Sequence, residues 1–159
     1  MKSTIQLELN IQYKGLHASL DALCALVKTI ENSALFPIQS GELSLAFVDD
    51  KTLASIHADF MDDPSPTDVI TFPAEPAMQS AGEILISVDR AIEQAHRQGA
   101  PLSHELSLYL VHGWLHLAGH EDNTPESILK MRTAENTCMQ MLQEAGQLDA
   151  FDIEHPTAQ

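Results

Sequence analysis

Two histidines in the second half of the chain, His112 and His116, lie four positions apart. On an α-helix, side chains four residues apart lie on one face, one turn apart. Two imidazoles with this spacing can bind one tetrahedral metal ion, each through a nitrogen about 2.0–2.1 Å away. The spacing therefore predicts a site for a divalent metal ion, with zinc as the first choice.

The residues around this pair indicate a buried helix. The stretch from Leu106 to Ala118 is apolar on nearly every face, which is typical of a core helix. Buried histidines need partners, because an unsatisfied buried polar group costs about 1–3 kcal/mol. A shared ion satisfies both rings, and we favour it over two separately hydrogen-bonded core histidines. Gly113 costs roughly 1 kcal/mol relative to alanine inside a helix, which indicates close approach of another element or of substrate.

The third ligand should follow the helix. In a continuous helix His120 would lie roughly 12 Å from His112 and could not share its ion. We expect Gly119 to end the helix, so that the chain turns and Asp122 becomes the natural third ligand, with His120 and Glu121 as alternatives. Three protein ligands leave one position for water, as in catalytic zinc sites, and a bound ion lowers the pKa of that water.

Three further residues are candidates for chemistry near this site. Glu121 could act as a general base, although its position favours a solvated loop carboxylate. Thr67 and Asp68 begin a predicted strand that could line a substrate cleft, and the alternative is a local turn in which Asp68 caps the backbone.

Other residues have a structural and a functional interpretation. Trp114 could stack on a nucleobase, but on so apolar a helix it should belong to the core. Arg132 and Glu135 on the last predicted helix could form part of a groove or only a surface ion pair.

Hydrophobic periodicity predicts the elements that position these residues. Strands are expected at 5–12, 41–48, 67–72 and 82–88, and helices at 16–33, 50–61, 88–99, 102–118 and 124–146. This order predicts an α+β or irregular α/β fold, in which a mixed four-stranded sheet packs with about five helices and the metal site lies on a core helix. We expect one domain over residues 1–159, with a loose tail after about residue 147.

The chain has 159 residues and a net charge of −15, which argues against a nucleic-acid partner because phosphate binding favours basic patches. Contact with RNA would have to be local, through a metal ion and a few cations (Arg90, Arg97, Lys130 and Arg132). The first residues lack the apolar block of a signal peptide, and the longest apolar stretch is too short for a bilayer. We therefore expect a cytoplasmic protein with no membrane partner.

Three motifs resemble the YbeY family of bacterial endoribonucleases. The segment HGWLHLAGHED at 112–122 is similar to that family's signature, PTDVITFP at 66–73 to its Pro-Thr-Asp strand, and GEILIS at 82–87 to its Gly-Asp-Ile strand. The order and spacing agree from about residue 40 to residue 142. The resemblance implies a metal-dependent single-strand endoribonuclease that acts in ribosomal RNA maturation and ribosome quality control, with RNA and the ribosome or a ribosome-associated protein as partners. It also implies zinc bound at His112, His116 and Asp122.

The sequence departs from the family pattern at two places. The family's third histidine is Asp122 here, and its Tyr-Asp is His120-Glu121. An aspartate is a known zinc ligand, and its charge should make the site more tolerant of harder ions such as manganese. The family's usual arginine before the Thr-Asp strand corresponds to Met61, which removes a cation that could steady a phosphate.

Three functions fit these observations. The first is the metal-dependent endoribonuclease. The second is a zinc metalloprotease-like hydrolase, although the glutamate that follows the first histidine in such enzymes is Gly113 here. The third is a non-catalytic, metal-containing ribosome-assembly factor.

Overall fold

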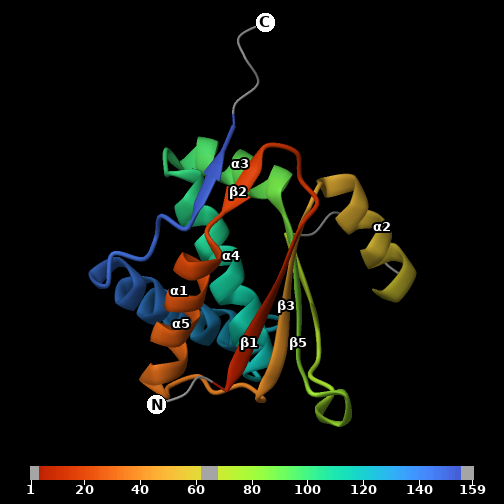
Figure 1. The fold of residues 1–159 in the computed structure, drawn as a ribbon, viewed down its shortest axis with the longest axis vertical. Helices are drawn as coiled ribbons and strands as arrows, with labels where there is room; N and C mark the ends of the chain where they lie inside the picture. Colours follow the sequence, from red (N-terminus) through yellow and green to blue (C-terminus); the bar gives the residue numbers. More distant parts are fainter. Residues whose placement is uncertain (1–3, 62–67, 155–159) are drawn as a thin grey trace, which may run out of the picture.

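The computed structural model describes residues 4–61 and 68–154 (Figure 1). Its elements follow one another as β1 (Ile5–Ile11), β2 (Leu16–Ala18), α1 (Leu20–Ser33), β3 (Gly41–Val48), α2 (Asp50–Met61), β4 (Val69–Phe72), the 3₁₀ turn η1 (Pro76–Met78), β5 (Ser80–Ser87), α3 (Val88–Gln98), α4 (Leu102–Leu117), α5 (Pro125–Glu144) and β6 (Phe151–Ile153). The five α-helices of the described chain agree with the predicted number.

The main sheet has four strands in the order β1-β3-β5-β4. Strands β1, β3 and β5 run parallel, and β4 pairs with β5 in the antiparallel direction. The central strands β3 and β5 are buried on both faces, because helices cover each side of the sheet. The predicted α+β class with a mixed four-stranded sheet is confirmed.

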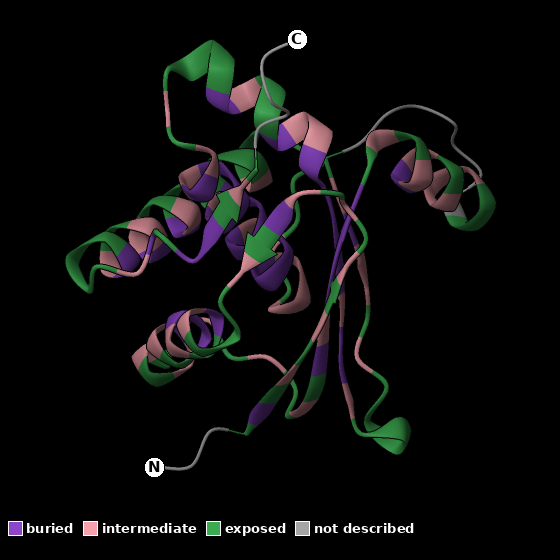
Figure 2. Ribbon diagram, turned by 45° about the horizontal axis from the view of Figure 1, so that its top comes forward, coloured by how far each residue is buried: buried purple, intermediate pink, exposed green. Residues whose placement is uncertain are grey.

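Helices α1, α4 and α5 cover one face of the sheet, and α2 lies on the other (Figure 1). The larger core joins α1, α4 and α5 to inward-facing residues of the sheet such as Leu45, Phe47 and Ile84. A smaller cluster on the opposite face contains Leu53 of α2 with Val48 and Ile70. In Figure 2 the buried residues follow the central strands and α4, which is thus the core helix that the sequence predicted.

The first predicted helix was placed too early. Residues Leu16–Ala18 form β2, and α1 begins at Leu20 after Ser19, whose hydroxyl accepts a hydrogen bond from the backbone N–H of Ala22. Leu16 is buried as predicted, but from a strand. Its spacing to the later leucines fits a helix as well, so periodicity alone could not locate the start.

The predicted loose tail is wrong for residues 148–154. Strand β6 pairs with β2 in a second, two-stranded antiparallel sheet. Leu148, Ala150 and Phe151 are buried, and the ring of Phe151 meets that of Phe47 with centroids 5.1 Å apart. The backbone N–H of Phe151 also donates to the hydroxyl of Ser103. Burial of these apolar residues orders the segment against the core.

Helix α4 approaches β5 closely at Gly113. A β-carbon at this position would lie 2.5 Å from Cγ2 of Ile84, which is itself fully buried. The predicted reason for this glycine, close approach of another element, is confirmed. None of the helices in the described chain is long and apolar enough to cross a membrane.

Candidate metal centre

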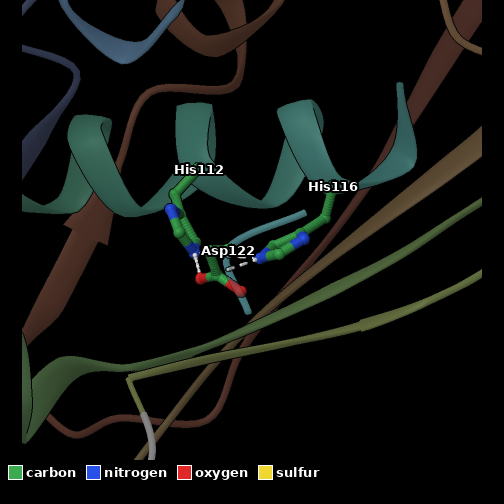
Figure 3. Close-up of side chains that lie close together, drawn as sticks. All are labelled: His112, His116 and Asp122. Carbon is green, nitrogen blue, oxygen red and sulfur yellow. Dashed lines mark hydrogen bonds and ion pairs between the residues drawn. The ribbon is translucent and has the colours of Figure 1, made fainter. Parts of the chain in front are cut away.

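The side chains of His112, His116 and Asp122 converge on one point beside α4 (Figure 3). The Nε2 atoms of the two histidines are 3.0 Å apart. Oδ2 of Asp122 lies 3.4 Å from Nε2 of His112 and 3.5 Å from Nε2 of His116. The structure therefore brings together the three residues that the sequence proposed as ligands.

The turn after α4 carries Asp122 back towards the two histidines. Gly119 has φ +101°, a left-handed conformation that favours glycine. The N–H of Gly119 donates to the carbonyl of His116, and the N–H of His120 donates to that of Leu115, which is the Schellman pattern of a helix end. Helix α5 then begins after the Thr124 cap, as predicted, so Asp122 lies on a short connection held at both ends.

Each histidine has a fixed acceptor for its other ring nitrogen. Nδ1 of His112 lies 2.5 Å from Oε2 of Glu135 on α5. Nδ1 of His116 lies 3.0 Å from the backbone carbonyl oxygen of His120. A carbonyl and an ionised carboxylate can only accept, so both Nδ1 atoms carry the proton. In neutral rings both Nε2 atoms then present lone pairs towards each other and towards Asp122.

This arrangement fits a cation. Two lone pairs and a carboxylate oxygen face one another with no hydrogen to join them, and a positive ion between them removes the repulsion. Ligand atoms about 2.0–2.1 Å from a tetrahedral ion are about 3.3 Å from one another, close to the separations of 3.0–3.5 Å seen here. The outer contacts of Glu135 and His120 are of the kind that orients metal-binding histidines.

The centre opens onto a cavity of about 510 Å³. Its wall contains the three candidate ligands. The other polar or charged residues in the wall are Asp68, Tyr109, Arg132 and Glu135, and the apolar residues are Val69, Leu108, Ile128 and Met131. Three predicted ligands leave the fourth side of a tetrahedral site for a molecule in the cavity.

Asp68 lies in the cavity wall, as expected for a residue that contacts substrate. Burial raises the pKa of its carboxyl group, and the positive charge of Arg90 partly opposes this shift. Thr67, the other predicted substrate-binding residue, lies outside the described residues.

The remaining candidates are not brought into the cavity wall. Glu121 is exposed and is not among the lining residues, so its role as a base stays a prediction without geometric support. His120 contributes its backbone carbonyl, while its ring packs edge-on against Phe36. Trp114 is buried, and its indole N–H donates to the carbonyl of Phe36 at 2.8 Å, which confirms its place in the core.

Glu135 is the residue whose role the sequence left undecided. The structure places it in the cavity wall, with its carboxylate on His112 and not on Arg132. The position on the buried side of α5, four residues after Met131, was the available signal. Its partner could not be chosen before the packing of α4 against α5 was known.

Fold and site together define a class: α+β domains that carry a candidate His-His-Asp metal centre on a core helix beside a cavity. The family model described as "Endoribonuclease YbeY" matches residues 5–143, and the chain belongs to this family.

Relatives named Endoribonuclease YbeY occur in several bacteria. The one from Rhodopirellula baltica is 42% identical over 106 residues, which cover 64% of this chain and 54% of the relative. The one from Rhodococcus opacus is 38% identical over 109 residues, which cover 61% of each chain. In both cases the chain spans less than two thirds of the relative's length. A relative from Mycobacterium sp. (strain KMS) is 31% identical over 158 residues, covering 90% of this chain and 86% of its own.

A solved structure supports the fold. A solution structure from Thermotoga maritima superposes with a TM-score of 0.56 at 24% sequence identity, and the match covers 98% of this chain and 99% of the other. At this identity the likeness concerns the fold alone.

Proposed function

We propose that this chain is a divalent-metal-dependent endoribonuclease that cuts single-stranded RNA, with ribosomal RNA as its substrate. The observation that carries the proposal is the convergence of His112, His116 and Asp122 beside a cavity. These three residues lie within the segment that resembles the signature of the YbeY family, and the family model spans that segment.

The residues of the site have two roles, to bind the ion and to orient the histidine rings that bind it. His112, His116 and Asp122 would hold the ion, which when bound supplies an acidified water and neutralises charge that develops on the phosphodiester. Glu135 accepts a hydrogen bond from Nδ1–H of His112, and the carbonyl of His120 accepts one from Nδ1–H of His116. Both rings are thereby held with Nε2 directed at the centre.

We assign the handling of a proton to Asp68 and not to Glu121. Asp68 is among the residues that line the cavity, whereas Glu121 is not. A carboxylate in this position can accept a hydrogen bond from a water molecule or a ribose hydroxyl. The raised pKa of Asp68 brings its basicity closer to that of a general base at neutral pH.

Zinc is the ion we propose, with manganese as a competitor because Asp122 adds a negative oxygen ligand. The proposal includes a cytoplasmic location and a partner that is the ribosome or a ribosome-associated protein. The net charge of −15 supports the need for a partner, since a chain so acidic has little general affinity for RNA.

The other two functions have less support. In a protease of the His-Glu-x-x-His type a glutamate follows the first histidine, and here that residue is Gly113, packed against Ile84. A non-catalytic metal-containing assembly factor would share the site and differ only in turnover.

The test is cleavage of an internally labelled single-stranded RNA by the purified protein, with casein as the alternative substrate. We expect RNA cleavage that a chelator abolishes, that zinc restores, and that His116→Ala loses together with the bound ion. His104→Ala is the matched control, because His104 lies on the same helix outside the cavity wall.

The other outcomes distinguish the functions. An ion bound without RNA cleavage would favour the assembly factor, and cleavage of casein would favour a peptidase. RNA cleavage retained in full by His116→Ala would refute the assignment of the site.

A further inference from the structure

One cation lines the cavity. Of the described residues in the cavity wall, Arg132 carries the only permanent positive charge, whereas Asp68, Asp122 and Glu135 are carboxylates. Arg132 is exposed on α5, one helical turn before Glu135 and one turn after Ile128. A guanidinium therefore shares the wall of one cavity with three carboxylates and the proposed metal centre.

The charge of Arg132 is not neutralised by the described residues. Its neighbour along the helix, Glu135, is engaged with Nδ1 of His112 at 2.5 Å. The other two arginines pair with carboxylates, Arg90 with Asp50 and Arg97 with Glu93. Within residues 4–61 and 68–154, Arg132 alone among the arginines makes no ion pair, in a chain with an excess of carboxylates.

A free guanidinium at this place suits a phosphate group. Its planar fork can donate two parallel hydrogen bonds to phosphate oxygens. The wall beside Arg132 offers aliphatic groups, Ile128 and Met131, and the ring of Tyr109, which also lines the cavity, is only 7% exposed and presents little surface for a base to stack on. Trp114 is unavailable for stacking because it is buried and hydrogen-bonded to Phe36. The wall can thus hold the RNA backbone more readily than it can read a base.

We propose that Arg132 binds a backbone phosphate of the RNA next to the metal centre, and that this contact is independent of base sequence. The inference rests on the proposed function, because it names how the same cavity takes its substrate. It makes Arg132 a substrate-binding residue that adds local affinity to an acidic protein.

Binding of fluorescently labelled single-stranded RNA tests this contact, measured by anisotropy at several salt concentrations in the presence of chelator so that the RNA stays intact. We expect Arg132→Gln to weaken binding about tenfold, because a hydrogen bond to a charged group is lost. The slope of log K against log salt should fall by about 0.7, the value for one phosphate of a single strand. Arg132→Lys keeps the charge without the fork and should lie between wild type and Arg132→Gln.

Lys28→Gln is the matched control, because it removes the same charge from an exposed position on α1 that is absent from the cavity wall. It should change neither the affinity nor the salt slope. Two RNAs of different base composition should show the same loss with Arg132→Gln, and with zinc restored that variant should raise KM for cleavage more than it lowers kcat.

Failure of the Arg132 assignment and failure of the proposed function give different results. If the wild type cuts and binds RNA but Arg132→Gln behaves as Lys28→Gln does, the assignment of Arg132 is overturned and the proposed function stands. A loss confined to one base composition also overturns it in favour of base recognition. If the wild type neither binds nor cuts RNA, the proposed function itself fails.

Discussion

At the residue scale, the protonation of two imidazole rings decides what the site can hold. Glu135 and the carbonyl of His120 each accept a hydrogen bond from Nδ1–H of one histidine, so both Nε2 atoms point at the same place as acceptors. Asp122 adds an oxygen to this group. The side chain of Glu135 is only 13% exposed, so little solvent competes for its contact with His112.

Glu135→Gln tests this contact. The amide can still accept from Nδ1, but it lacks the charge that raises the basicity of the ring. We expect zinc affinity to fall about 10–100-fold, as is typical when an outer partner of a metal-binding histidine is changed. Competition with a chromogenic chelator measures the effect. Glu144→Gln, an exposed change on the same helix, should leave the affinity unaltered, and an equal affinity for Glu135→Gln would contradict the role of Glu135.

At the element scale, the position of α4 on the sheet depends on the absence of a side chain. Gly113 sits between the two histidines, and its Cα faces Ile84 of β5. Because Gly113 has no side chain, α4 can pack closely against the sheet at the turn that carries His112 and His116. The position of the helix and the position of the metal ligands are therefore linked.

Gly113→Ala should destabilise the protein although alanine favours helix. Overpacking against Ile84 costs about 1–3 kcal/mol, and the gain in helix propensity offsets roughly 1 kcal/mol of it. In an Ile84→Ala background the clash is absent, so the same change should stabilise by roughly 1 kcal/mol. Urea unfolding of the four proteins in chelator measures the cycle. A stabilising effect of Gly113→Ala in the wild-type background would contradict the close contact.

Most elements could be predicted because each has a local cause. Neighbouring residues determine the start of α5 at Thr124-Pro125, the end of α4 before Gly119 and the alternation of buried and exposed residues in β1. The pairing of β2 with β6 has no such cause, since it joins residues 16–18 to 151–153. Three-residue strands show little periodicity, and their partner is set by the tertiary structure.

In the candidate site, too, some features follow from the local sequence and others depend on tertiary packing. His112 and His116 follow from helical spacing, and Asp122 from the expected turn at Gly119. The contact of Glu135 with His112 crosses from α5 to α4, and the place of Arg132 in the cavity wall depends on the same packing. Helix spacing could show that Arg132 and Glu135 share a face but could not show what that face meets.

At the scale of the whole molecule, a chain with a net charge of −15 also buries a carboxyl group within its described residues. Glu105 on α4 is only 5% exposed. Burial raises the pKa of its carboxyl group, the negative charge of Asp68 raises it further, and His104 partly opposes the shift. Ionised Glu105 is therefore less favourable in the folded protein than in the unfolded chain.

Glu105→Gln should reveal the cost of burying ionised Glu105 as a pH-dependent difference in the free energy of unfolding between variant and wild type. A raised folded pKa means that the stabilising contribution of Glu105 is complete below the ordinary pKa of 4.5 and is lost as pH rises through the folded value. Glutamine does not titrate, so the variant should gain stability relative to wild type between about pH 4 and pH 7. Urea unfolding in chelator measures the difference. Exposed Glu144→Gln is the control, and a difference that stays constant over this range would rule out the burial effect.

The metal centre is the central claim, and the most direct measurement is the position of the ion in zinc-loaded crystals by anomalous scattering at the zinc edge. We predict one peak about 2.0–2.1 Å from Nε2 of His112 and of His116, and about 2.0–2.2 Å from a carboxylate oxygen of Asp122. The peak should be absent from crystals of His116→Ala. A zinc-loaded protein with no peak within bonding distance of both histidines would contradict the claim.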